Sequence, residues 1–186
     1  MNQEFNPRKE GKAHWHEEIV RPSYVTPENI AQKNPLKDMY YDAQDRKHKI
    51  RDVTLPMRTM NIHISEIEPG QKTRAHKHHN EAIVYIMQGK GYSLVQGEKY
   101  EWEAGDFLYI PVFNWHQHFN TGEENVYFMG ITNKRMLDWL GLDRKVEAGV
   151  HVTEEEMQEE IAAKKHSPYS WYKISPEEGV KFGKQE

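Results

Sequence analysis

The chain has 186 residues, with 25 Lys and Arg against 29 Asp and Glu, so its formal net charge is -4. A chain of this length can bury roughly 70% of the surface that its unfolded form exposes, so we expect one structural domain overall. The negative charge gives no attraction to nucleic acid or to an anionic membrane, which leaves a small-molecule substrate or a protein as the expected partner. The absence of cysteine excludes disulfides and zinc-thiolate sites, so histidine and carboxylate side chains are the available metal ligands.

Residues 1–55 are predicted to form an N-terminal arm, because they are polar and prolines interrupt any long element. Thr26 followed by Pro27 is typical of a helix start and predicts one short helix near residues 27–33. The first residues contain no apolar signal region, and no stretch approaches ~20 apolar residues, so the sequence supports neither secretion nor a membrane-spanning helix. We therefore expect a cytoplasmic protein.

Residues 56–132 show the two-residue periodicity of β-strands. Met60, Ile62 and Ile64 are separated by single polar residues, which indicates a strand with two different faces. Further β-rich runs, separated by glycine-containing turns, are expected at residues 82–87, 92–95, 106–112, 116–119 and 126–131. Short strands at regular spacing indicate an all-β sandwich or small barrel.

Residues 133–186 are predicted to form a C-terminal helical extension. A first helix is expected over residues 133–140, where Gly141 ends it. Thr153 followed three residues later by Glu156 forms a capping box, which predicts a second helix that runs to about Lys165.

Two histidine clusters, His76-Lys77-His78 and His116-Gln117-His118, lie within the β-rich region. Side chains two residues apart on a strand point to the same side. Two imidazoles of one strand and a third from another strand can therefore form a facial metal site.

The spacing around these clusters resembles the two motifs of the cupin superfamily. Gly70, His76, His78 and Gly89 match the first motif, and the second is matched by Gly105, Pro111, His116 and Asn120. The resemblance covers residues 70–120. It implies a double-stranded β-helix, which is a jelly-roll-like barrel, with a metal in its mouth. The metal ligands carried over from the family are His76, His78 and His116.

One position departs from the usual cupin pattern. Ala82 stands where cupins place a metal-binding glutamate, and Glu81 lies one residue early. Because a one-residue step turns a side chain to the other face of a strand, Glu81 needs a bulge to reach the metal or its immediate surroundings. The alternative is a carboxylate exposed to solvent at the start of the strand.

The missing glutamate and the sequence around His116 resemble the gentisate and salicylate ring-cleaving dioxygenases. In those enzymes three histidines alone hold Fe(II), and His118 matches a further histidine that contacts the substrate. The resemblance ends where the substrate is chosen, because Val84 replaces an arginine of those enzymes, and Arg58 is the nearest candidate to replace it. The candidate pocket residues are Asn61, His63, Ser65, Val84 and Trp115. For Asn61, His63 and Ser65, the alternative is that these side chains form a polar outer face of the sheet. For Trp115, the alternative is a place in the core.

These observations predict a metal-dependent cupin, with a non-haem Fe(II) dioxygenase acting on a hydroxylated aromatic or other chelating acid as the first hypothesis. His118 would be a catalytic proton shuttle or hydrogen-bond donor. The alternatives are a metal-assisted isomerase, lyase or decarboxylase that uses Mn, Ni or Zn, and a non-catalytic small-molecule-binding cupin. The resemblance also implies a homodimer, because single-cupin chains commonly pair.

Overall fold

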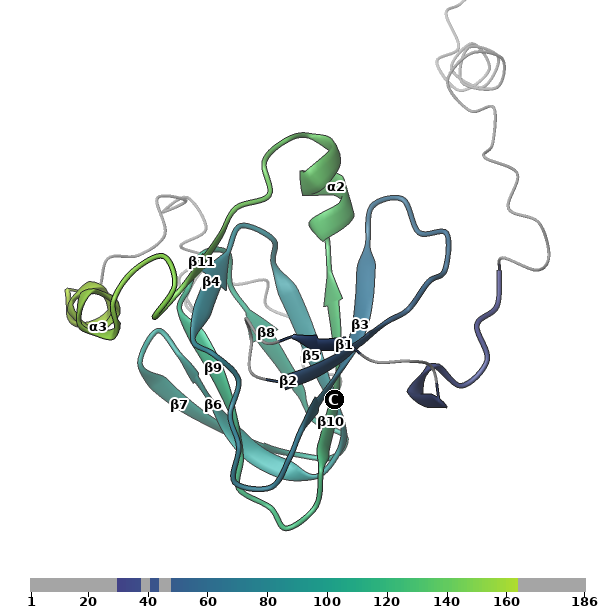
Figure 1. The fold of residues 1–186 in the computed structure, drawn as a ribbon, viewed down its shortest axis with the longest axis horizontal. Coiled ribbons are helices and arrows are strands. Elements are labelled where there is room, and N and C mark those ends of the chain that lie inside the picture. The colour runs from purple at the N-terminus through teal and green to yellow at the C-terminus, as the bar shows by residue number, and fades with distance from the viewer. Residues whose placement is uncertain (1–29, 38–40, 44–47, 164–186) are drawn as a thin grey trace, which may run out of the picture. The chain divides into compact units, whose positions relative to one another are not determined.

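A computed structural model describes residues 30–37, 41–43 and 48–163 of the protein (Figure 1). These residues belong to two units. The first unit includes residues 30–33 and 54–56, where the backbone N–H of Thr54 donates to the side-chain oxygen of Gln32 at 2.7 Å. All other described residues belong to the second unit. No helix in the described ranges is long and apolar enough to span a membrane.

Two antiparallel sheets make up the second unit (Figure 1). The six-stranded sheet has the order β1 (Tyr41–Ala43), β2 (His48–Asp52), β3 (Asn61–Ile67), β10 (Val126–Thr132), β5 (Ala82–Gln88) and β8 (Phe107–Ile110). The five-stranded sheet has the order β11 (Lys145–Glu147), β4 (His76–His78), β9 (His116–Asn120), β6 (Lys90–Val95) and β7 (Glu98–Glu103). The predicted all-β class is confirmed.

Alternation of side chains along the strands builds the apolar core between the sheets. In β5 and β10, every second residue from Ala82 to Ile86 and from Val126 to Thr132 is buried. The apolar residues among them, from Ala82 to Ile86 and from Val126 to Phe128, pack with Ile67 of β3 and Trp102 of β7 into one hydrophobic cluster. The same alternation continues toward the open end of the sheets, where polar residues replace apolar ones and line a cavity.

The helices in the described ranges are short, and they occur in the segments that precede, connect or follow the strands. The 3-10 helix η3 spans Pro35–Lys37, α2 spans Lys134–Trp139 and α3 spans Glu154–Ala162. The predicted capping box of α3 is present, because Thr153 and Glu156 exchange side-chain and backbone hydrogen bonds. The helix expected near residues 27–33 is wrong for residues 30–33, which are not helical, and residues 27–29 lie outside the described ranges.

Helix α3 packs beside the five-stranded sheet and forms a second, smaller core (Figure 1). Met157 of α3 is buried in a cluster with Trp115, Ala75 and Ala148. Glu160 accepts hydrogen bonds from Lys77 Nζ at 2.5 Å and from Trp115 Nε1 at 3.1 Å. Because Lys77 lies between His76 and His78, these contacts anchor the strand that carries both histidines.

Candidate metal centre

Three histidines of neighbouring strands meet at one end of the five-stranded sheet. His76 and His78 come from β4, and His116 of β9 is the direct cross-strand partner of His76. The ring centroid of His116 lies 4.2 Å from that of His76 and 4.7 Å from that of His78. One nitrogen of each ring lies within 4.8 Å of the other two. The structure therefore brings together the three histidines that the sequence singled out.

Backbone carbonyls fix the orientation and the tautomer of all three rings. The Nδ1 atoms of His76, His78 and His116 lie 2.9, 2.6 and 2.9 Å from the carbonyl oxygens of residues 74, 80 and 114. A carbonyl oxygen only accepts, so each Nδ1 carries the proton and donates it. Each Nε2 is then unprotonated and offers a lone pair, which is the arrangement found in histidines that bind metal ions.

Two of these histidines, His76 and His116, are also held in the neutral form that binds metal. Burial, followed by the neighbouring histidines, lowers the pKa of His76 and of His116 well below the ordinary value. The positive charge of Lys145 acts in the same direction on both rings. Because a protonated imidazole has no lone pair for a metal, the surroundings keep this group ready for ligation at neutral pH.

A fourth histidine, His118, lies beside the three but is held differently. Its ring centroid is 5.8 Å from that of His116, and its Nδ1 shares a hydrogen bond of 2.7 Å with the hydroxyl of Ser93. Trp102 donates from Nε1 to the same hydroxyl oxygen at 2.8 Å. The side chain of Thr73 accepts from the His118 backbone at 3.0 Å. The ring of His118 is thus held by the buried side chains of Ser93 and Trp102, whereas the rings of the other three histidines bond backbone carbonyl oxygens.

The four histidines line a cavity of about 230 Å³ between the two sheets. Its apolar wall consists of Ala82, Val84, Ile110 and Phe128. The remaining lining residues are polar or small and come from both sheets and from the segment after β10: His48, Asp52, Asn61, His63, Ser65, Thr73, Asn80, Gly130, Thr132, Lys134, Asp143 and Lys145. A cavity of this size and composition suits a small polar molecule.

Most of the predicted pocket residues line this cavity. Asn61, His63 and Ser65 face it from β3, and Val84 faces it from β5. The polar face of β3 therefore looks inward, and the alternative of a polar outer face is wrong.

Trp115 is the exception among the predicted pocket residues. It is 2% exposed, packs with Met157 of α3, and is absent from the cavity lining. Trp115 immediately precedes His116, so its side chain leaves the strand on the opposite face and meets α3. The pocket interpretation is corrected to a core role.

Two charged residues that the sequence placed near the site also lie elsewhere. The carboxylate of Glu81 accepts a hydrogen bond from the Tyr109 hydroxyl at 3.2 Å, and Glu81 belongs neither to the histidine group nor to the cavity lining. Arg58 is not one of the described residues that line the cavity. The positive charges along the lining come instead from Lys134 and Lys145.

Several lining residues could not be recognised from the sequence. His48 lies on β2, a strand that the sequence analysis assigned to the arm, and its charge contributes to the shift of the His118 pKa. Lys145 of β11 lies directly opposite His78 and forms an ion pair with buried Glu147. Strand β11 has only three residues, and a lysine and a glutamate flank its single valine, so it carries no strong strand signal.

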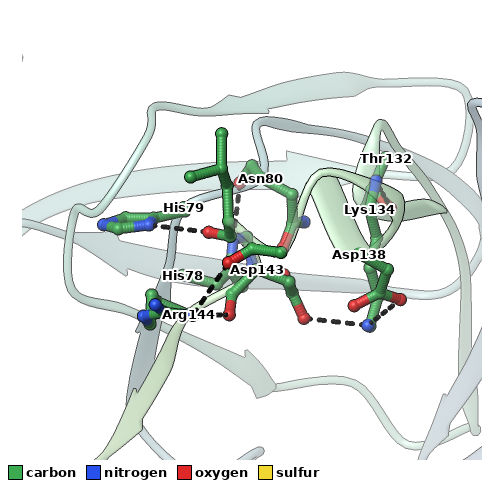
Figure 2. A network of polar contacts seen from close by, with 10 residues as sticks. His78, His79, Asn80, Thr132, Lys134, Asp138, Asp143 and Arg144 are labelled. Atoms are coloured by element: carbon green, nitrogen blue, oxygen red, sulfur yellow. Dashed lines mark hydrogen bonds and ion pairs between the residues drawn. The ribbon is translucent and has the colours of Figure 1, made fainter. Parts of the chain in front are cut away.

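A polar network joins residues 132–144 to residues 78–80 (Figure 2), and several of its members line the cavity. Lys134 donates to Asp138 at 2.6 Å and to Asp143 at 2.8 Å. The ring of His79 bonds the carbonyl oxygen of Leu142, and the His79 backbone N–H donates to the carbonyl oxygen of Arg144. The segment that contains α2 is therefore tied to the turn that follows His78.

The buried histidines predict that acid destabilises the metal-free protein. Burial, with the charges of His48 and His78, lowers the pKa of His118 to about 3, whereas an unfolded histidine titrates near 6.5. The unfolded state then binds more protons than the folded state between these values, so stability is lost as pH falls from about 6.5 toward 3. The slope expected from His118 alone approaches about 1.4 kcal/mol per pH unit. Urea unfolding at several pH values measures it, and a His118→Phe variant that keeps the full slope would contradict this assignment.

Comparisons with known proteins find similarity over the part of the chain that holds this site. Residues 63–132 match the cupin domain family. The chain is 30% identical over 92 residues to a 5-aminosalicylate 1,2-dioxygenase of Comamonas sp, covering 50% of this chain and 24% of that protein. It is also 30% identical over 91 residues to a gentisate 1,2-dioxygenase of Ralstonia sp, covering 48% of this chain and 24% of that protein. The chain thus spans about a quarter of the length of these relatives.

The fold is likewise similar to that of a solved structure, the salicylate 1,2-dioxygenase of Pseudaminobacter salicylatoxidans. The TM-score is 0.52 at 17% sequence identity, and the similarity covers 55% of this chain and 30% of that one. The two antiparallel sheets, the spacing of the two histidine motifs and the family match all indicate the same fold. Residues 63–132 match the cupin domain family, and this region holds the three histidines whose nitrogens converge.

Proposed function

We propose that the protein is a non-haem Fe(II) dioxygenase that acts on a hydroxylated aromatic acid or another chelating acid. The observation that carries this proposal is the convergence of three Nδ1-anchored histidines on one point of a small cavity. Within the described residues no carboxylate belongs to this group. Three protein ligands leave positions open for other molecules, which is typical of a catalytic site and not of a structural one.

The donor set fits a divalent metal and favours an anionic chelating ligand. Three neutral imidazoles would leave the full positive charge of the ion, whereas a fourth carboxylate ligand would cancel part of it. A set of three nitrogens with open positions is compatible with Fe(II), and Mn, Ni or Zn can occupy similar sites. Bound Fe(II) would supply the one-electron chemistry that allows dioxygen to react with an organic substrate.

The residues of the chain would hold and orient the reactants. His76, His78 and His116 would keep the metal at the cavity wall, with their carbonyl partners fixing the direction of each ring. His118 would donate a hydrogen bond to the substrate or move a proton, because it lines the same cavity and is connected to the Ser93 hydroxyl. The apolar wall around Val84 and Phe128 would hold the hydrocarbon part of the substrate and exclude water.

The relatives support the class of reaction, and they leave the substrate open. Their names describe 1,2-dioxygenases of 5-aminosalicylate and of gentisate, which are aromatic acids with a hydroxyl group next to the carboxylate. The arginine position of those enzymes is Val84 here, so the substrate of this chain is proposed at the level of a chelating acid. A homodimeric, cytoplasmic enzyme stays a prediction of the sequence.

Oxygen uptake by the iron-loaded protein tests the proposal. Protein purified without added metal is first analysed for its metal content and then reconstituted anaerobically with Fe(II). An oxygen electrode screen of catechols, hydroxybenzoates and diketones should identify a substrate that consumes one O₂ per molecule without an external reductant, because a dioxygenase places both oxygen atoms in the product. Turnover without oxygen consumption would favour the isomerase, lyase or decarboxylase alternative. Binding without turnover would favour a non-catalytic cupin.

A further inference from the structure

Three neighbouring strands of the six-stranded sheet carry apolar side chains on the side away from the cavity. In β10, β5 and β8, every second side chain points into the core or the cavity, so the residues between them lie on the outer face of the sheet. None of these outer residues is charged: Tyr127, Met129 and Ile131 of β10, Ile83, Tyr85 and Met87 of β5, and Phe107 and Tyr109 of β8. Together they form the outer apolar face.

The outer apolar face is open to solvent, most of all along β8, which is the last strand of its sheet. Phe107 is 69% exposed, Tyr109 47%, Ile83 45% and Met87 38%. The rings of Phe107 and Tyr85 lie with their centroids 4.7 Å apart, so each limits the motion of the other before any partner binds. Exposed aromatic residues and methionines without charged neighbours are typical of the centre of a protein–protein interface.

The exposed area of the outer apolar face matches one side of a dimer interface. Because a fully exposed phenylalanine or tyrosine presents about 150–250 Å², Phe107 and Tyr109 alone expose on the order of 200 Å². All residues of the face together present roughly 500 Å², which is near the upper end of the apolar patches on monomeric proteins. A standard interface takes about 800 Å² from each partner, and about 65% of it is apolar in homodimers, which again gives roughly 500 Å².

The register of the three strands makes this face complementary to a second copy of itself. Two rows cross the sheet from β8 through β5 to β10: Phe107, Tyr85 and Met129 form one, and Tyr109, Ile83 and Ile131 form the next. A two-fold axis parallel to the strands and placed over β5 would lay β8 of one copy over β10 of its partner. Phe107 would then meet Met129 of the partner subunit, and Tyr109 would meet Ile131 of the partner subunit. Aromatic rings attract methionine sulfur, so each row of one copy suits the same row of the other.

We propose that two copies of this chain pair through the outer apolar face, with the two-fold axis over β5. The sequence predicts a homodimer only as a state, and this face supplies its surface and its symmetry. The proposal does not depend on the reaction that the cavity performs. It does connect pairing to the cavity, because Val84 lies in the cavity wall on the inner side of β5, between Ile83 and Tyr85 on the outer side. The partner copy would therefore support the strand behind that wall.

Sedimentation equilibrium of the full-length protein tests the proposed surface. The unaltered protein should be dimeric at concentrations of about 10 µM and above, because interfaces of this size have dissociation constants of micromolar or lower. Phe107→Lys and Met129→Glu should each raise the dissociation constant of the dimer at least about 100-fold, since each places an unpaired charge in the interface twice, once on each side of the axis.

The double variant Phe107→Lys, Met129→Glu tests the symmetry. In the proposed arrangement the lysine of one copy meets the glutamate of the other, so the double variant should dimerise at least about 10-fold more tightly than either single variant. Trp139→Lys is the matched control, because Trp139 lies on α2, outside the face, and is 89% exposed. It should keep the dissociation constant of the unaltered protein. Circular dichroism spectra and metal content, measured on every variant, show that the monomers are folded.

Three results would overturn the proposal. A dimer that Phe107→Lys and Met129→Glu leave intact uses another surface. Weakened single variants without recovery in the double variant would contradict the axis over β5. An unaltered protein that stays monomeric up to about 100 µM would exclude a second copy as the partner, since a standard interface would hold the dimer together at that concentration. The melting temperature of Phe107→Lys would then identify what covers the face: a decrease indicates another segment of the same chain, and no change indicates a different protein.

Discussion

Replacing His76 with alanine is expected to remove both metal binding and the stability that metal provides. The site joins β4 and β9, so a metal present at ~100 times its dissociation constant should stabilise the folded protein by about 2.7 kcal/mol. His76→Ala removes one of three ligands at the centre of the group, because His76 is the cross-strand partner of His116. The variant should contain little metal, and its melting temperature should no longer respond to added metal or to a chelator.

A histidine outside the group provides the control. His79 follows His78 in the chain, and its ring bonds the carbonyl oxygen of Leu142. His79→Gln should therefore retain the metal content and most of the metal-dependent rise in melting temperature. A melting curve of the unaltered protein that does not change on chelation would show that the three histidines hold no metal under those conditions.

Replacing His118 with alanine is expected to separate catalysis from metal binding. His118 Nδ1 bonds Ser93, and His118 is not among the three residues whose nitrogens converge. His118→Ala should keep the metal and lower turnover by about 100-fold or more, which is typical for the loss of a residue that transfers a proton. His116→Ala should lose both metal and activity.

The Ser93→Ala variant tests whether the hydrogen bond from Ser93 to His118 contributes to turnover. Ser93 connects His118 to Trp102, and its loss should lower turnover less than the loss of His118 itself, because the imidazole remains. Metal content and turnover are measured on the same preparations. Full activity with full metal content in His118→Ala would remove the proposed role, and loss of metal in that variant would make His118 a fourth ligand.

The strands that build the cavity wall were predictable from their periodicity, and the elements that complete it were not. The alternating residues of β3 and β5, and the spacing around His76 and His116, are local patterns of the sequence. Strand β7 was missed because five of its six residues are exposed and Trp102 alone is buried, so it shows no apolar period. Short β11 depends on pairing with β4, which lies far away in the chain, and no local pattern encodes that pairing.

The same distinction applies to the site. The three histidines could be assigned because two of them share a strand and a known spacing places the third. The orientation of their rings could not, because it depends on carbonyl oxygens of residues 74, 80 and 114, whose positions follow from the folded backbone. For Trp115 the sequence left a pocket position and a core position open, and the core position follows because neighbouring residues of a strand point to opposite faces.

A crystal structure of the metal-loaded protein tests the central claim most directly. We expect one ion with the Nε2 atoms of His76, His78 and His116 at about 2.0–2.2 Å, and Glu81 still bonded to Tyr109. The remaining coordination positions should hold water or a chelating acid from the cavity side. Direct coordination by Glu81, or an ion bound away from these three nitrogens, would contradict the three-histidine centre and remove the main support for a dioxygenase.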